Sequence, residues 1–147
     1  MPLVTLRAVI TEDLPIFFEH QSDPIAARLA AFPSRDRDAF FAHWTTRVLG
    51  DPANTTRTIL SDNHVAGNIG AWTDAETRER LIGYWIGRDF WSRGIATSAL
   101  SQFLEYERTR PLVACVVKHN LPSIRVLEKS AFTRTGENPE EFIYTLA

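Results

Sequence analysis

The stretch from Leu81 to Leu100 joins a strand pattern directly to a helix pattern, and it constrains the fold more than any other part of the chain. Its first part, Leu81 to Ile86, is apolar, aromatic and β-branched and has an arginine close to each end, which is typical of a buried strand. From Ile95 onward the apolar residues recur at the spacing of one helical face. The sequence therefore predicts a strand, a short loop and a helix in succession.

The loop runs into the helix through Arg93-Gly94-Ile95-Ala96-Thr97, whose small residues let a ligand approach the main chain. A helix start presents several N–H groups that have no partner inside the helix, and these groups favour an anion. The alternative is an ordinary strand–turn–helix junction with a closely packed glycine, because short glycine patterns are frequent. The loop by itself does not choose between these two interpretations.

Composition and charge exclude several classes of protein. The chain has 147 residues, of which 44% are hydrophobic and 23% are charged, and we expect one domain over residues 1–147. The net charge of −2 offers no basic surface for nucleic acid or for an anionic membrane, and no apolar run is long enough to span a bilayer. The single cysteine, Cys115, cannot form an intramolecular disulfide, and no signal sequence is evident. We therefore expect a cytoplasmic protein.

The residues before Leu81 are predicted to form a first strand, three helices and a hairpin. The strand is expected over Leu3 to Val9, and the helices over residues 11–22, from a cap at Asp23 to Ala31, and from Arg35 to Leu49. Strands over Thr56 to Leu60 and Val65 to Trp72 are joined by a turn-rich tetrapeptide, which predicts the hairpin.

The residues after Leu100 complete a mixed sheet. The helix is expected to end near Arg108, and the apolar run Pro111 to Val117 indicates a strand buried on both faces. A strand, a helix and a strand in this order imply a parallel pair with a right-handed crossover. Two final strands are expected over Phe132 to Thr135 and Glu141 to Leu146. The fold class is therefore α+β.

Two motifs resemble the GNAT acyltransferases. The first, Trp91 to Ala96, is similar to the family's pyrophosphate-binding loop: its glycine and small-residue positions match, and Trp91 stands where most of the superfamily has Gln or Arg. An aromatic residue at that position is common in the branch that acetylates the N-termini of ribosomal proteins. The second motif, Val117 to Phe132, has Asn120 and Ser123 at the matching positions, and its Leu-Glu-Lys triplet is typical of the same branch.

The resemblance implies a fold and an activity. The fold would be a central mixed sheet of six to seven strands flanked by about four helices, with a splay between the fourth and fifth strands. The activity would be an acetyl-CoA-dependent N-acetyltransferase that moves the acetyl group directly to a primary amine of a small molecule or of a peptide or protein N-terminus. The alternative is a non-catalytic module of the same fold that binds or senses acyl-CoA. Acetyl-CoA would be the co-substrate, without a metal, and the protein would be a monomer or a homodimer.

The resemblance also implies which residues meet the two substrates. Main-chain groups in the splay would bind the pantetheine arm, the loop and helix start would bind the pyrophosphate, and the helices between His20 and Trp44 would wall the acceptor site. The acetyl-CoA residues would be Tyr84, Trp85, Ile86, Ser92, Arg93, Gly94, Ile95, Ala96, Thr97, Asn120 and Ser123.

Ser123 is the candidate catalytic residue. It would lie near the sulfur, where a hydroxyl can donate to the departing thiolate. Many GNAT enzymes place a tyrosine one helical turn further on as the general acid, but that position is Leu127 in this chain, and Ala131 replaces the usual glycine before Phe132. The other interpretation is that Asn120 and Ser123 only form a helix cap.

The general base stays open between a water relay and a side chain such as His119, Tyr84 or an early-helix acid. The spacing of His20, His43 and His64 suggests neither a catalytic triad nor a metal site. Cys115, in an apolar strand, is expected to be an inert core thiol rather than a nucleophile.

Overall fold

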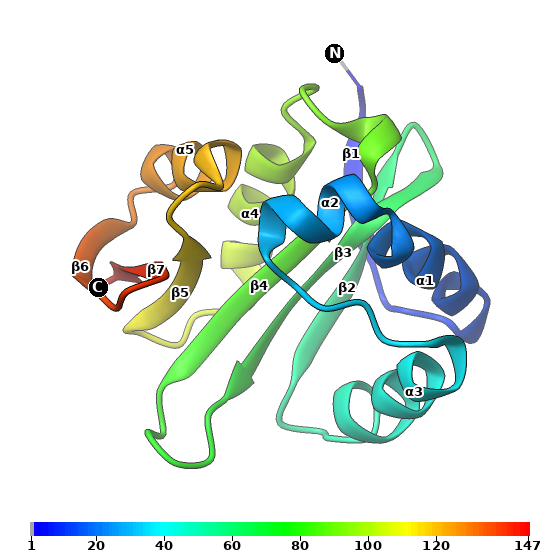
Figure 1. Ribbon diagram of the computed structural model, residues 1–147, viewed down its shortest axis with the longest axis horizontal. Coiled ribbons are helices and arrows are strands. Elements are labelled where there is room, and N and C mark those ends of the chain that lie inside the picture. The colour runs from blue at the N-terminus through cyan, green and yellow to red at the C-terminus, as the bar shows by residue number, and fades with distance from the viewer. Residues whose placement is uncertain (1) are drawn as a thin grey trace.

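A computed structural model describes residues 2–147, in which the seven strands form one mixed sheet (Figure 1). The strands are β1 (Val4–Arg7), β2 (Thr55–Ser61), β3 (His64–Thr73), β4 (Arg80–Ile86), β5 (Leu112–Val117), β6 (Thr133–Glu137) and β7 (Glu141–Leu146). Their order is β1-β2-β3-β4-β5-β7-β6, and the pair β4–β5 is parallel while the other neighbours are antiparallel. The predicted α+β class, mixed sheet and strand order along the chain are confirmed.

The helices flank this sheet. They are α1 (Leu14–Ser22), α2 (Pro24–Ala30), α3 (Arg37–Ala42), α4 (Ile95–Tyr106) and α5 (Leu121–Lys129), with short turns η1 (Thr11–Asp13), η2 (His43–Val48) and η3 (Arg88–Phe90). The predicted cap of the second helix is present, because the Asp23 side chain accepts from the N–H groups of Ile25 and Ala26. The predicted helix from Arg35 to Leu49 starts later, at an Asp36 cap, and changes to a π-helical turn at His43.

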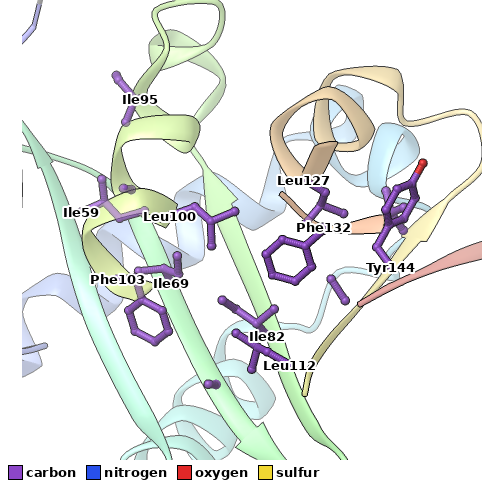
Figure 2. Close-up of a cluster of buried hydrophobic side chains, with 14 of the residues drawn as sticks. Ile59, Ile69, Ile82, Ile95, Leu100, Phe103, Leu112, Leu127, Phe132 and Tyr144 are labelled. Carbon is purple, nitrogen blue, oxygen red and sulfur yellow. The ribbon is translucent and has the colours of Figure 1, made fainter. Parts of the chain in front are cut away.

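Two clusters of buried side chains hold the layers together. The larger cluster joins the sheet to α4 and α5, and Figure 2 shows Leu100 and Phe103 of α4 beside Ile69 of β3 in it. The smaller cluster joins α1 to the segment α3–η2 through residues such as Phe17 and Trp44, whose ring centroids lie 5.0 Å apart. Each helical face therefore has its own core, and the sheet separates them.

Strands β4 and β5 separate soon after they begin to pair. Among the described residues their register includes Arg80 with Leu112 and Leu81 with Val113, and no further pair. Strand β5 continues alongside β7 as far as Val117, and Figure 1 shows β4 diverging from it. This confirms the predicted splay between the fourth and fifth strands, and it leaves one edge of β4 unpaired from Ile82 to Ile86.

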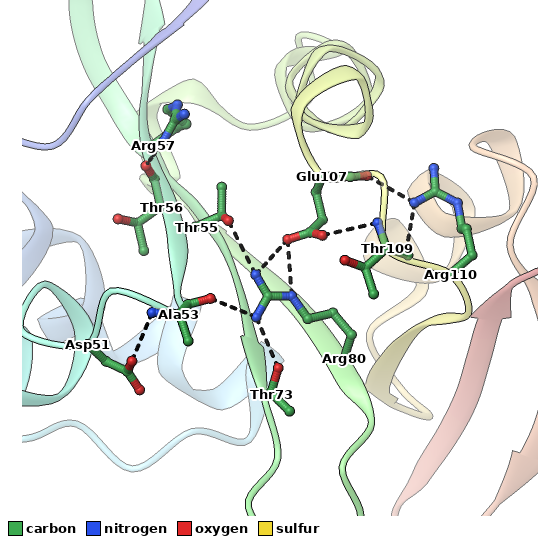
Figure 3. A network of polar contacts seen from close by, with 10 residues as sticks. All are labelled: Asp51, Ala53, Thr55, Thr56, Arg57, Thr73, Arg80, Glu107, Thr109 and Arg110. Atoms are coloured by element: carbon green, nitrogen blue, oxygen red, sulfur yellow. Dashed lines mark hydrogen bonds and ion pairs between the residues drawn. The ribbon is translucent and has the colours of Figure 1, made fainter.

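A buried ion pair fixes the base of the splay (Figure 3). The guanidinium of Arg80 donates to Glu107 through Nε (3.1 Å) and Nη2 (2.7 Å), and Glu107 is buried beyond the end of α4. The same guanidinium donates to the carbonyl of Ala53 (2.9 Å) and to the hydroxyls of Thr55 and Thr73 (3.2 and 3.1 Å). Arg80 therefore ties three strands to the segment that follows α4.

One local prediction is wrong, and one residue that departs from the family pattern keeps the expected turn. Cys115 is exposed, so the prediction of a core thiol was wrong. Alternate residues of a strand point to opposite faces of the sheet. Ala114 and Val116 lie on the face that packs against α5, so Cys115 points to the opposite face. Among the described residues, no helix covers that face at Cys115. Ala131, where the family usually has glycine, forms the tight turn with a left-handed backbone (φ 71°).

Candidate active site

A cavity of about 390 Å³ lies beside the unpaired edge of β4 and the start of α4. Its lining residues are Ala26, Leu29, Ala30, Tyr84, Trp85, Ile86, Phe90, Trp91, Ser92, Gly94, Ile95, Ala96, Thr97, Asn120, Pro122, Ser123, Arg125, Val126 and Lys129. We refer to it as the first cavity. Its lining includes every residue that the sequence predicted for acetyl-CoA except Arg93. That side chain is exposed, with its guanidinium carbon 5.9 Å from the ring centroid of Phe90.

The start of α4 is open at the first cavity. No side chain caps this helix, and Gly94 precedes it in a left-handed conformation (φ 73°). A Cβ added at Gly94 would meet no heavy atom within 4 Å, so there is free space beside the first turn. The uncapped N–H groups, the helix dipole and this space suit a phosphate group. The prediction of a ligand-approach site is therefore the better interpretation of this loop, since the glycine is not closely packed.

Trp91 has a contact that the sequence did not reveal. Its indole N–H donates to the main-chain carbonyl of Ile86 at 2.9 Å. The ring thereby ties the loop to the end of β4, across the short turn η3. The aromatic residue at the first position of the motif thus has a structural role that fixes the loop to the strand.

Tyr84 and Ser123 meet across the splay. The phenolic oxygen of Tyr84 lies 2.7 Å from Oγ of Ser123, and either oxygen can be the donor. Burial raises the pKa of Tyr84 to about 12, although the hydrogen bond to Ser123 acts in the opposite direction. The phenol therefore stays protonated at neutral pH. Asn120 accepts from the N–H of Ser123 at 3.3 Å, so the predicted helix cap is present and leaves the Ser123 hydroxyl free for Tyr84.

A second cavity, of about 550 Å³, adjoins the first. Its lining residues are Phe17, Gln21, Phe32, Arg35, Phe40, His43, Trp44, Arg47, Val48, Asp51, Asn54, Thr56, Asn68, Ile69, Gly70, Ala71, Trp72, Thr73, Gly83, Tyr84 and Trp85. Tyr84 and Trp85 line both cavities. The segment between His20 and Trp44 therefore does contribute a wall, and the two cavities meet at the middle of β4.

Comparison with known proteins decides the family. The sequence model of the acetyltransferase (GNAT) domain matches residues 4–133. The chain belongs to the GNAT family. A curated relative, an uncharacterized N-acetyltransferase p20 of Bacillus licheniformis, is 27% identical over 143 residues, which cover 90% of this chain and 80% of that protein. The chain is accordingly a GNAT N-acetyltransferase, as the two motifs predicted.

Solved structures show the same fold. A domain from Methanocaldococcus jannaschii DSM 2661 superposes with a TM-score of 0.83 at 20% identity, over 99% of each chain. RimL, a ribosomal protein acetyltransferase solved in complex with coenzyme A, superposes with a TM-score of 0.76 at 18% identity, over 97% of this chain and 93% of that one. These neighbours confirm the GNAT fold predicted from the sequence.

The first cavity of this GNAT enzyme is lined by no carboxylate and no imidazole among the described residues. His119 lies outside both cavities, where its Nε2 is 3.1 Å from the carbonyl of Arg28. His20 packs against Gly87, and a Cβ added at Gly87 would come within 2.6 Å of its ring. Of the side chains considered as a base, Tyr84 is the one at the meeting point of the cavities, and its raised pKa makes it a donor rather than a base.

Among residues 2–147, no group of three or more His, Cys, Asp or Glu side chains is arranged to hold a metal ion. His20 packs on Gly87, His43 lines the second cavity and His64 begins β3 with an exposed side chain. In the same part of the chain no helix is long and apolar enough to cross a membrane.

Proposed function

We propose that this GNAT domain, over residues 1–147, transfers an acetyl group from acetyl-CoA directly to a primary amine. Acetyl-CoA binds in the first cavity and the amine binds in the second. The observation that carries this proposal is that the two cavities share Tyr84 and Trp85, next to the paired hydroxyls of Tyr84 and Ser123. A donor and an acceptor held in adjoining cavities react with the entropic advantage of an intramolecular reaction.

The residues of the first cavity suit acetyl-CoA. The unpaired edge of β4 at Tyr84, Trp85 and Ile86 offers main-chain donors and acceptors to the amide groups of a pantetheine arm, as an added strand would. Ser92 to Thr97 provide the uncapped start of α4 for the pyrophosphate, and Arg93 adds a positive charge from the exposed side of the loop. Asn120 lines the same cavity, and in this proposal it contacts the arm.

The reaction forms a bond between the amine nitrogen and the acyl carbon and breaks the bond between that carbon and sulfur. Ser123 donates a hydrogen bond to the departing sulfur, and Tyr84 donates to Ser123, which strengthens the Ser123 donor. An ordinary thiol has a pKa of about 8.5, well below the pKa of about 12 that Tyr84 has in this site. Full proton transfer from Tyr84 to the thiolate is therefore uphill. The pair stabilises the thiolate by hydrogen bonding. The proton that the amine nitrogen loses on forming the amide passes to solvent, and a proton from solvent converts the thiolate to the thiol.

Thiol release from acetyl-CoA tests this function. The purified enzyme is incubated with acetyl-CoA and a panel of amines, amino acids and peptides, and free thiol and acetylated product are measured by absorbance and mass spectrometry. We expect release that depends on both the enzyme and one class of amine. Calorimetric binding of CoA without release across the panel would instead support the non-catalytic module.

A further inference from the structure

The ionisable residues of the second cavity are mostly basic. Arg35, His43 and Arg47 line it, and Asp51 is the one carboxylate among its described lining residues. This balance is opposite to that of the whole chain, whose net charge is −2. The acceptor side of the enzyme therefore concentrates positive charge that the rest of the protein does not have.

The two arginines are available to a ligand. Within residues 2–147 neither Arg35 nor Arg47 has a carboxylate within ion-pair distance, whereas the structural arginines Arg7 and Arg80 are each paired with a buried acid. Asp51 does not neutralise them, and its carboxylate accepts from the N–H of Ala53 at 2.9 Å. An unpaired guanidinium in a cavity is a good partner for a carboxylate or a phosphate.

Hydrogen bonds from neighbouring side chains hold the main chain of both arginines. The main-chain carbonyl of Arg35 accepts from the buried side chain of Gln21 at 3.1 Å, and its guanidinium carbon lies 5.6 Å from the centroid of the Phe32 ring. The main-chain carbonyl of Arg47 accepts from the Asn54 amide at 3.1 Å. The pKa of His43 lies below its ordinary value because of burial and because both guanidiniums act on it. Arg35, His43 and Arg47 all line the second cavity, and both guanidiniums act on the imidazole of His43.

The remaining wall is aromatic. The rings come from α1, η2, α3, two strands and the loop after α2, and they are Phe17, Phe32, Phe40, Trp44, Trp72 and Trp85. Trp72 is 42% exposed, and its indole lies across Gly83, where an added Cβ would be 3.2 Å from the ring. Trp85 packs edge-on against Phe32 with their ring centroids 5.6 Å apart, at the junction with the first cavity. Such a wall binds an apolar or aromatic body.

We propose that the acceptor is a primary amine that carries an anionic group and an aromatic or other bulky apolar body, as an aromatic amino acid does. Arg35 and Arg47 bind the anionic group, the aromatic wall binds the body, and the amine points toward Tyr84 and Ser123. This inference rests on the proposed function. A polyamine is disfavoured because its positive charges would meet the two guanidiniums.

Matched pairs of amines test this specificity. Tryptophan is compared with tryptamine and phenylalanine with phenethylamine, so that each pair differs in the carboxylate, and phosphoethanolamine is compared with ethanolamine to distinguish a phosphate from a carboxylate. Spermidine is the cationic comparison. We expect kcat/KM to be roughly 10- to 100-fold higher for the anionic member of a pair, the effect of a hydrogen bond between charged groups. A higher kcat/KM for tryptamine or spermidine would overturn the inference.

The variants Arg47→Gln and Arg35→Gln test whether the two guanidiniums cause the preference for the anionic amine. Each change should raise KM for the anionic amine roughly 10-fold or more and leave its kcat and the KM of the neutral partner nearly unchanged. Arg108→Gln is the charge-matched control, because Arg108 is exposed and lines neither cavity. Equal effects of Arg47→Gln on both members of a pair would contradict the proposed contact.

Failure of the proposed function has a different signature. If no amine in the panel releases thiol, the proposed function fails. Calorimetric binding of the same amines in the presence of CoA then still tests the ligand preference of the second cavity. Tryptophan should then bind more tightly than tryptamine, and Arg47→Gln should remove the difference. Absence of that difference would overturn the inference independently of turnover.

Discussion

The hydroxyl oxygens of Tyr84 and Ser123 lie 2.7 Å apart, and the two residues come from opposite sides of the splay. Tyr84 belongs to β4, and Ser123 belongs to the first turn of α5, which follows β5. The contact therefore spans the gap that opens where β4 and β5 stop pairing. It places two hydroxyl groups at the point where the first and second cavities meet.

Ser123→Ala should lower kcat by roughly 10- to 1,000-fold and change the affinity for acetyl-CoA little, because the lost donor acts on the departing sulfur. The cap of α5 survives, since Asn120 provides it. Steady-state kinetics and thermal melting on this variant separate the two roles. A normal kcat with a loss of about 0.5 to 1.5 kcal/mol of stability would show that the Ser123 hydroxyl has only a structural role, as the hydrogen-bond partner of Tyr84.

Tyr84→Phe should lower kcat in the same range, and the double variant with Ser123→Ala should be little worse than either single variant, because the two hydroxyls act as one unit. Burial raises the pKa of Tyr84 to about 12, so the phenol keeps its proton up to strongly alkaline pH. The native kcat should therefore not decline between about pH 7 and pH 10. A decline with an apparent pKa near the ordinary tyrosine value of about 10, absent from Tyr84→Phe, would refute this assignment.

Gly94→Glu should abolish binding of CoA while the protein still folds. The carboxylate would enter the free space beside the start of α4 and repel a pyrophosphate there. Gly94→Ala is the matched control, because it places the same backbone strain on the left-handed residue without the charge. In calorimetric titration with CoA, the alanine variant should bind and the glutamate variant should not. Equal affinity in both folded variants would remove the phosphate site from this loop.

Stability should fall in acid because of Glu107. Burial raises its pKa, but hydrogen bonds from Arg80 and Thr109 outweigh burial, so the folded pKa lies below the ordinary value. This contribution to stability is complete above the unfolded pKa of about 4.3, and it is lost as the pH falls through the lowered folded pKa.

Arg80→Met should cost about 3 to 5 kcal/mol of stability at neutral pH, since it leaves the buried Glu107 unpaired. In denaturant titrations Arg88→Met, which removes an exposed ion pair, should have a far smaller effect.

Ala131→Gly should stabilise the protein by about 1 kcal/mol, because alanine is strained in the left-handed conformation that glycine adopts freely. The expected rise in Tm is about 2 to 4 °C for a chain of this size. Ala99→Gly, within α4, is the contrasting control and should lower Tm. A lower Tm for Ala131→Gly would show that the methyl group makes a contact worth more than the strain.

Local patterns predicted most of the fold. The hairpin between β2 and β3 followed from its turn residues, and Asp62 and Asn63 do take the left-handed conformations of a tight hairpin turn. The start of α4 followed from Gly94 and the apolar spacing after it. In contrast, the burial of a strand depends on which helices lie over it. For this reason the apolar sequence around Cys115 gave the wrong environment for that residue.

The site was predictable where it depends on the main chain and less so where it depends on distant side chains. The loop at Gly94 has a sequence pattern, whereas the contact of Tyr84 with Ser123 joins residues 39 positions apart and has none. The alternation of a strand does place Tyr84 and Trp85 on opposite faces of β4, which is the one signal that could have separated their roles. Arg35 precedes the cap of α3 and Arg47 lies in η2, so no local sequence pattern indicates that both line one cavity.

Apart from Tyr84 and Trp85, the two cavities have no described lining residue in common. Residues of α1 and of the segment from Phe32 to Thr73 line the second cavity, together with the middle of β4, while α2 and residues from β4 to α5 line the first. In the function that we propose, substitutions in α3 and η2 therefore change which amine is accepted without disturbing the loop at Gly94. During evolution, substitutions among the lining residues of the second cavity can therefore change the acceptor while selection preserves the lining residues of the first cavity. The same partition makes residues 35–54 the natural segment to randomise when a new acceptor is sought by directed evolution.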